Sequence, residues 1–218
     1  MMTRLRSLLS SKYYLAFEFA ALFGGMPLLV LAIKDRGLML TLLWIGSILT
    51  YLYVREHHGM DRNDSGLRAG LRPVLMRFAL LAPIIAGMTW AFMPDQFLSL
   101  PLERTSLWVK IMVFYPLLSV WPQEMIYRTF LYNRYAPLFG RGNGFIAASA
   151  LAFGFMHILF LNWVALAMTV IGGYLFARDY AKHQSLWLAC IEHALYGCLI
   201  FTVGLGIFFY SGAAWGTP

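Results

Sequence analysis

The sequence predicts an all-α fold: a polytopic transmembrane helical bundle with about seven spans. Of the 218 residues, 60% are hydrophobic and only 12% are charged, whereas a soluble domain carries about 45–50% apolar and roughly 25% charged residues. Seven stretches also reach the length of about 20 mostly apolar residues that a membrane-spanning helix needs. These observations exclude a soluble globule, a disordered chain, a coiled coil and a small disulfide scaffold.

The predicted spans follow one another with short breaks. They cover residues 13–34, 37–54, 74–94, 106–135, 144–161, 163–181 and 185–210. Charges and glycines mark the breaks, as at 34–37 and 140–144. The polar stretch 55–72 is consistent with a short surface helix. Residues 95–103 are too few to span, so we expect them at the interface or in a re-entrant turn.

The basic residues indicate the orientation of the chain. With the N-terminus inside, eleven of the 17 Lys and Arg residues fall in cytosolic segments and three fall outside, as the excess of positive charge on cytosolic loops requires. The net charge of +7 is then explained without nucleic acid. A basic N-terminal segment before a long apolar run is typical of a signal anchor. We therefore expect an integral protein of a bacterial inner membrane with a cytoplasmic N-terminus.

Ionisable residues within spans are candidates for function, because each costs several kcal/mol in the bilayer. They are Glu18, Arg77, Lys110, Glu124, Arg128, His157, Glu192 and His193. Arg77 and Lys110 lie near span ends, from which their side chains are expected to reach the interface. At 1.5 Å per residue, Glu124, His157 and His193 lie about 16, 20 and 12 Å from the cytosolic ends of their helices. We expect them at one level in the cytosolic half of the bilayer.

This set of side chains predicts hydrolytic chemistry. Glu124 and Arg128 share a helix face, so the arginine is expected to keep the carboxylate ionised, although the pair could also serve only to fix helix packing. A carboxylate and a histidine can take a proton from water and direct it at a carbonyl, while a second imidazole stabilises the oxyanion. Zinc bound by Glu124, His157 and His193 is a weaker alternative, because the histidines lie on separate helices and no His-Glu-x-x-His pattern occurs.

Three segments resemble motifs of the CAAX protease and bacteriocin-processing family (CPBP, or ABI). Residues 123–128 resemble its Glu-Glu-x-x-x-Arg motif, residues 153–157 match Phe-x-x-x-His, and residues 193–197 resemble His-x-x-x-Asn. The resemblance covers about residues 106–200. It implies a helical intramembrane endopeptidase of the glutamic type, similar to CAAX prenyl protease 2, which needs no cofactor.

The resemblance also implies roles for single residues. In the family, the first glutamate of the first motif and the histidine of the second activate water, and the third motif lines the oxyanion site. Gln123 stands at the place of that glutamate, His157 corresponds to the water-activating histidine and His193 to an oxyanion donor. Gly197 stands at the asparagine position, and the neighbouring Tyr196 is a candidate replacement for the lost donor.

The departures at Gln123 and Gly197 leave three explanations open. Glu124 is the working base, about 100° round the helix from Gln123; or Glu192 supplies the carboxylate; or the protein is a non-catalytic member that acts in bacteriocin immunity or as a membrane scaffold. A small transporter or proton relay is a further class of function, but the internal repeat typical of many transporters does not stand out in the sequence.

The resemblance divides the chain into two parts. We expect N-terminal transmembrane helices and a cytosolic loop at 1–105, and a CPBP-like catalytic core at 106–218. The expected partners are the lipid bilayer and a peptide or membrane-protein substrate, whose identity the sequence does not specify. The sequence also leaves the oligomeric state open.

Overall fold

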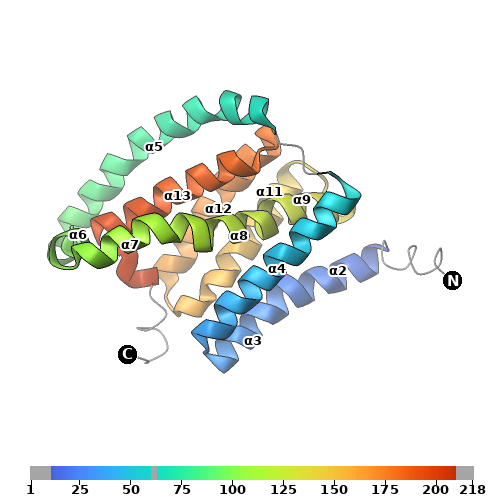
Figure 1. Cartoon of the computed structure of the whole chain (residues 1–218), viewed down its shortest axis with the longest axis horizontal. Helices are drawn as coiled ribbons and strands as arrows, with labels where there is room; N and C mark the ends of the chain where they lie inside the picture. Colours follow the sequence, from blue (N-terminus) through green and yellow to red (C-terminus); the bar gives the residue numbers. More distant parts are fainter. Residues whose placement is uncertain (1–10, 60–62, 210–218) are drawn as a thin grey trace.

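The computed structural model describes residues 11–59 and 63–209, and all regular structure within these ranges is helical. Figure 1 shows long helices packed into a bundle, with α5 (Asp64–Phe92) arching over α13 (Leu186–Val203). Five helical segments in the described ranges are long and apolar enough to cross a membrane: 12–33, 36–57, 64–92, 143–160 and 186–203. The predicted all-α transmembrane bundle is confirmed.

The helical elements follow the order of the predicted spans. The N-terminal half consists of α2 (Lys12–Ala20), the π-helical turn η1 (Ala21–Gly25), α3 (Met26–Ile33), α4 (Arg36–His57), α5, the 3₁₀ turn η2 (Pro94–Gln96) and α6 (Ser99–Glu103). The C-terminal half consists of α7 (Thr105–Tyr115), η3 (Pro116–Val120), α8 (Trp121–Glu124), η4 (Met125–Phe130), α9 (Leu131–Arg134), α10 (Ala136–Phe139), α11 (Asn143–Met156), η5 (His157–Phe160), α12 (Trp163–His183), α13 and η6 (Leu205–Phe209).

Several predicted boundaries differ from the observed ones. The segments 105–134 and 163–183, which correspond to two predicted spans, are not among the five candidate spans; the first contains the π-helical turns η3 and η4. The polar stretch 55–72 is not a separate surface helix, because its ends extend α4 and α5. The last span ends at Val203 instead of residue 210, before Gly204 adopts a φ of 103°.

Short polar side chains determine where several helices begin. Asp35, Asn63, Asn162 and Ser185 each accept a hydrogen bond from a backbone N–H three residues later, at 2.6, 2.9, 2.8 and 3.4 Å. Such caps satisfy N–H groups that the first turn of a helix leaves without a partner. The polar residues in the breaks between the spans therefore also determine where the following helices begin.

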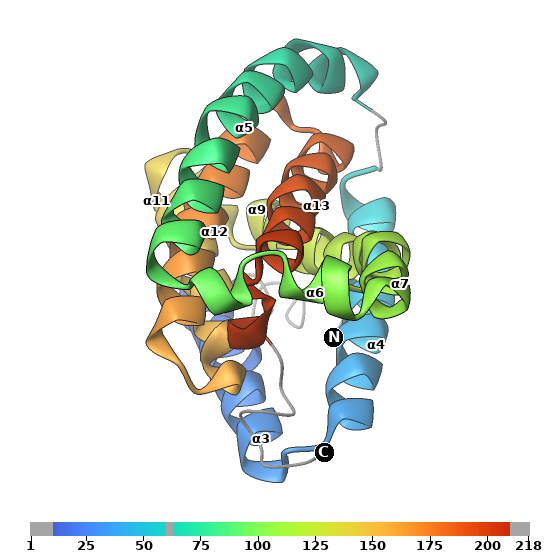
Figure 2. The ribbon, with the colours of Figure 1, turned by 90° about the vertical axis from the view of Figure 1, so that its left-hand side faces the viewer.

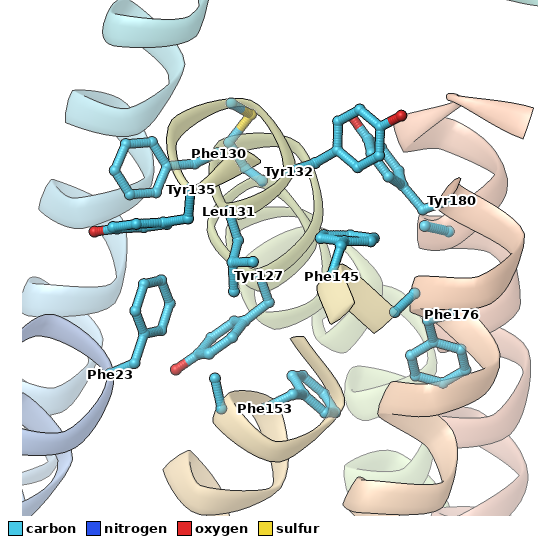
Figure 3. Close-up of a cluster of buried hydrophobic side chains, with 14 of the residues drawn as sticks. Phe23, Tyr127, Phe130, Leu131, Tyr132, Tyr135, Phe145, Phe153, Phe176 and Tyr180 are labelled. Carbon is cyan, nitrogen blue, oxygen red and sulfur yellow. The ribbon is translucent and has the colours of Figure 1, made fainter. Parts of the chain in front are cut away.

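An aromatic core holds the helices together. Figure 3 shows its rings converging from different helices: Phe23, Tyr127, Phe130, Tyr132, Tyr135, Phe145, Phe153, Phe176 and Tyr180. Beside this core, Arg134 of α9 donates to both carboxylate oxygens of Glu18 in α2 at 2.8 Å, and the Tyr135 hydroxyl donates to Glu18 Oε1 at 2.9 Å. Glu18 thus joins the N-terminal helix to the core.

A second ionic cluster joins α5, α12 and α13. Arg77 Nη2 lies 2.5 Å from Asp179 Oδ2 and also contacts Glu192 Oε1. The Glu192 side chain is fully buried and that of Arg77 is 17% exposed. The expectation that Arg77 reaches the membrane interface is therefore wrong. Two buried carboxylates face the middle of α5, and their charge keeps the arginine inside the bundle.

We expect Arg77→Ala to lower the free energy of unfolding by about 3–5 kcal/mol, because it leaves Glu192 buried without its cation and leaves Asp179 with only the partly exposed Arg178, 3.2 Å away. The exposed Arg68 of the same helix is the matched control, and its alanine variant should change stability by less than about 0.5 kcal/mol. Unfolding of both variants by SDS in detergent micelles provides the comparison. Equal stability of the two variants would contradict a structural role for the cluster.

The two ends of the bundle differ in charge. Basic residues gather near the α4–α5, α9–α11 and α12–α13 junctions, at Arg55, Arg68, Arg72, Arg134, Arg141, Arg178 and Lys182. We call this the basic end. Arg4, Arg6 and Arg62, on which the orientation prediction also depends, lie outside the described residues. Figure 2 shows α13 between α5 and α12 on one side and α4 on the other.

Candidate active site

Glu124 lies at the centre of a buried polar cluster. Its Oε1 is 2.8 Å from Nδ1 of His193 in α13, and its Oε2 is 3.0 Å from Arg128 Nε. Arg128 also donates to Ser149 Oγ of α11 at 2.6 Å. The side chains of Glu124 and Arg128 are fully buried (0% exposed). The four-residue spacing therefore produces an ion pair, and that pair orients His193.

Aromatic rings fix the plane of the His193 imidazole. The ring stacks on Phe176 with centroids 5.0 Å apart, and Phe153 meets it edge-on at 5.3 Å. The Arg128 guanidinium lies 4.8 Å from the centre of the Phe153 ring, a favourable cation–π position. Figure 3 shows Phe153 and Phe176 coming from different helices. Phe153, the first residue of the Phe-x-x-x-His motif, thus supports both the histidine and the arginine.

His157 begins η5, directly after α11. Its Nδ1 lies 2.7 Å from the carbonyl oxygen of Phe153. A carbonyl only accepts hydrogen bonds, so Nδ1 carries the proton and Nε2 of the neutral imidazole presents a lone pair. The motif spacing therefore prepares His157 to accept a proton through Nε2.

Gln123, His157 and His193 line one cavity of about 270 Å³. The side-chain amide of Gln123 donates to Ser119 Oγ at 2.7 Å, and Ser119 also lines the cavity. The Tyr115 hydroxyl lies 2.9 Å from His193 Nε2. The structure thus brings two histidines and an amide to one space that a substrate could enter.

The carboxylates lie outside this space. Neither Glu124 nor Glu192 is among the described residues that line the cavity. Glu124 is held by His193 and Arg128, and Glu192 by Arg77. The titratable side chains on the described wall are Tyr115, His157, His193 and Tyr196.

The cavity lies towards the end of the bundle opposite the basic end. Its wall includes Met39 near the start of α4, Phe160 after α11, and Phe201 near the end of α13. The expectation that the site lies in the cytosolic half of the bilayer does not fit this position, given the predicted orientation. A depth of about 20 Å at His157 already exceeds half of a hydrocarbon core of about 30 Å.

The zinc alternative needs three side chains that converge on one point. Among residues 11–59 and 63–209, no three His, Cys, Asp or Glu side chains are grouped in this way. Glu124 and His193 are in contact, but Arg128 occupies the other carboxylate oxygen. The residues proposed as zinc ligands therefore do not fit a metal centre in this arrangement.

Sequence reasoning missed Tyr115 and Ser119. A signal was present, because Tyr115, Ser119 and Gln123 recur every four residues and therefore share one face of the helical segment. Their hydroxyl groups carry no charge, so the ionisable residues within the spans do not indicate them. The polar stripe that ends at Gln123 indicates both residues.

Comparison with known proteins agrees with the three motifs. Residues 104–199 match the family model described as type II CAAX prenyl endopeptidase Rce1-like. Comparisons with curated proteins and with solved structures give no match. The family match covers all three motifs and nearly coincides with the region from which the resemblance was inferred. Residues 104–199 of this integral membrane protein are therefore similar to the type II CAAX prenyl endopeptidases.

Proposed function

We propose that the protein is an intramembrane endopeptidase that hydrolyses a peptide bond with water activated by His157. The observation that carries this proposal is the shared cavity of His157, His193 and Gln123, combined with the proton on His157 Nδ1 that the Phe153 carbonyl requires. A base must have a free lone pair within reach of water. His157 Nε2 meets this condition, while both neighbouring glutamates are held in ion pairs behind the wall.

In this mechanism, His157 Nε2 takes a proton from water as the oxygen attacks the peptide carbonyl carbon. The carbonyl oxygen becomes an oxyanion and is stabilised by hydrogen bonds near His193. The tetrahedral intermediate then collapses, the C–N bond breaks, and His157 returns the proton to the leaving amine. Glu124 is a positioning residue here, because its contact with His193 Nδ1 keeps a proton on that nitrogen and stabilises a positive imidazole.

Gln123 lines the cavity where the related motif has a glutamate. Its amide can position water but cannot accept a proton at neutral pH. We expect Gln123→Glu to raise kcat, by up to about 10²-fold, because a positioned general base contributes roughly 10²–10⁴-fold. Gln123→Ala is the matched comparison and should lower kcat through the lost water contact. A glutamate variant no faster than the alanine variant would contradict this role.

Cleavage of a quenched fluorescent peptide by detergent-purified protein tests the proposal. One probe is a farnesylated peptide that ends in a CAAX sequence, and the second is the same peptide without the lipid. We expect hydrolysis of one or both, unchanged by a zinc chelator, because water is activated by a side chain in this mechanism. Loss of activity with the chelator and its return with added zinc would support the zinc alternative.

The second candidate function is a non-catalytic role in bacteriocin immunity or as a membrane scaffold. It is favoured by Gln123, which lines the cavity without offering a base, and by the ion pair that holds Glu124 outside it. On this alternative the wild type shows no turnover, a cellular phenotype survives His157→Ala, and Gln123→Glu alone gains activity. Wild-type turnover that His157→Ala removes supports the protease.

The orientation of the chain in the membrane determines from which side a substrate reaches the cavity. With the basic end in the cytosol of a bacterium, the N-terminus is cytoplasmic and the cavity lies nearer the outer surface of the inner membrane. The substrate would then be a peptide or membrane protein that reaches the cavity through the outer half of the bilayer. Reporter fusions at the α4–α5 and α12–α13 junctions test this orientation, and an extracytoplasmic signal at either junction would reverse it.

A further inference from the structure

The space beside Gly197 is filled by Tyr115. A Cβ atom built on Gly197 would collide with the ring and hydroxyl of Tyr115. Both residues line the cavity, and their helices, α7 and α13, lie side by side in Figures 1 and 2. The phenol of Tyr115 therefore occupies the volume into which an asparagine at position 197 would extend.

The Tyr115 hydroxyl is held at the polar edge of His193. It lies 2.9 Å from His193 Nε2, while His193 Nδ1 lies 2.8 Å from Glu124 Oε1. The Tyr115 ring packs edge-on against Phe201, with centroids 5.4 Å apart. Glu124, His193 and Tyr115 thus form a continuous hydrogen-bonded row that starts behind the wall and ends in the cavity.

We propose that the Tyr115 hydroxyl, polarised by His193, is the hydrogen-bond donor to the oxyanion, in place of the side chain that Gly197 lacks. This inference rests on the proposed protease function. When His193 is positively charged, its Nε2–H donates to the Tyr115 oxygen, which leaves the phenol proton free to donate to the oxyanion. No bond to Tyr115 forms or breaks, and the proton taken from water resides on His157 until the amine leaves.

Tyr196 is the competing tyrosine, because it also lines the cavity and is adjacent to Gly197. Its ring packs against Phe78 of α5 with centroids 5.3 Å apart and against Phe176 of α12 at 6.2 Å. Tyr115, by contrast, has its hydroxyl hydrogen-bonded to His193. The contact with the proposed oxyanion histidine favours Tyr115 over Tyr196.

Tyr115→Phe tests the role of the hydroxyl while keeping the ring that fills the space. We expect kcat for the fluorescent peptides to fall about 10²–10³-fold, as for the loss of one oxyanion donor, with KM little changed. Tyr132→Phe is the matched control: Tyr132 is buried against Phe145 and Tyr180, and its variant should keep the wild-type rate. A wild-type rate in Tyr115→Phe, or the loss appearing only in Tyr196→Phe, overturns the inference.

A compensating pair tests the shared space. Gly197→Asn alone should reduce activity, because the new side chain meets Tyr115. Tyr115→Ala combined with Gly197→Asn should be faster than Tyr115→Ala alone, since the amide replaces the lost donor. If the double variant is no faster than Tyr115→Ala, an asparagine at position 197 does not replace the Tyr115 hydroxyl as donor, and the inference is contradicted. If wild-type protein does not cleave, the proposed function fails as well; if it cleaves and only His157→Ala is impaired, the Tyr115 inference alone fails.

Discussion

Replacing Glu124 with leucine should lower the free energy of unfolding by about 3–5 kcal/mol, because the fully buried Arg128 then has no counter-ion. Glu124 and Arg128 lie within the residues that match the family model, and both side chains are 0% exposed. The remaining partners of Arg128, such as Ser149 Oγ, are uncharged and do not compensate the cation. SDS unfolding in detergent micelles measures the difference from wild type.

The double variant Glu124→Leu/Arg128→Met is the control for this prediction. Removing both charges avoids an unpaired buried ion, and such replacements are often neutral or stabilising. We expect the double variant to recover most of the lost stability but to remain impaired in cleavage, because His193 has lost its carboxylate partner. A double variant less stable than the single one would show that the ion pair itself holds the helices together.

His157→Ala should lower kcat by about 10²–10⁴-fold, the usual contribution of a positioned general base. Of the two imidazole nitrogens of His157, Nε2 is the one with a free lone pair, because the Phe153 carbonyl fixes the proton on Nδ1. Folding should be little affected, since the imidazole lies at the end of α11 beside a cavity and not in the aromatic core. Peptide turnover by purified protein, with melting temperatures alongside, measures both effects.

His57 provides a matched control for His157. Its Nδ1 makes the same contact to a carbonyl four residues earlier, at 2.9 Å from Tyr53 O, but it is exposed at the basic end. His57→Ala should therefore keep the wild-type rate. An equal loss of kcat in the two variants would mean that the loss comes from the broken contact with the backbone carbonyl and not from the loss of a general base.

Local patterns were sufficient to predict much of the fold. Apolar run length located the transmembrane segments, and residues such as Asp35 and Ser185 mark helix starts because a cap is a contact within one turn. The four-residue spacing of Glu124 and Arg128 predicted their ion pair for the same reason. The boundary at 55–72 was wrong, because a polar helix end can continue beyond the apolar run that identifies the span.

Contacts between distant segments could not be predicted in this way. Arg77 was expected to reach the interface, since nothing near it in sequence indicates that Asp179 and Glu192 lie across the bundle. Counting residues from the helix ends predicted similar depths in the bilayer for Glu124 and His193, but it could not show that the carboxylate faces away from the cavity. The polar stripe with Ser119 and Gln123 indicates Tyr115, but its role could not be predicted, because that role depends on its ring filling the space beside Gly197.

The most direct test of the central claim is mass spectrometry of peptides incubated with catalytic amounts of wild-type and His157→Ala protein in detergent. We predict that the wild type yields two complementary fragments from a single cleaved bond over many turnovers, and that His157→Ala yields them at least about 10²-fold more slowly. Equal fragment yields from the two proteins, or intact peptide with both, would contradict hydrolysis at the cavity that His157 and His193 share.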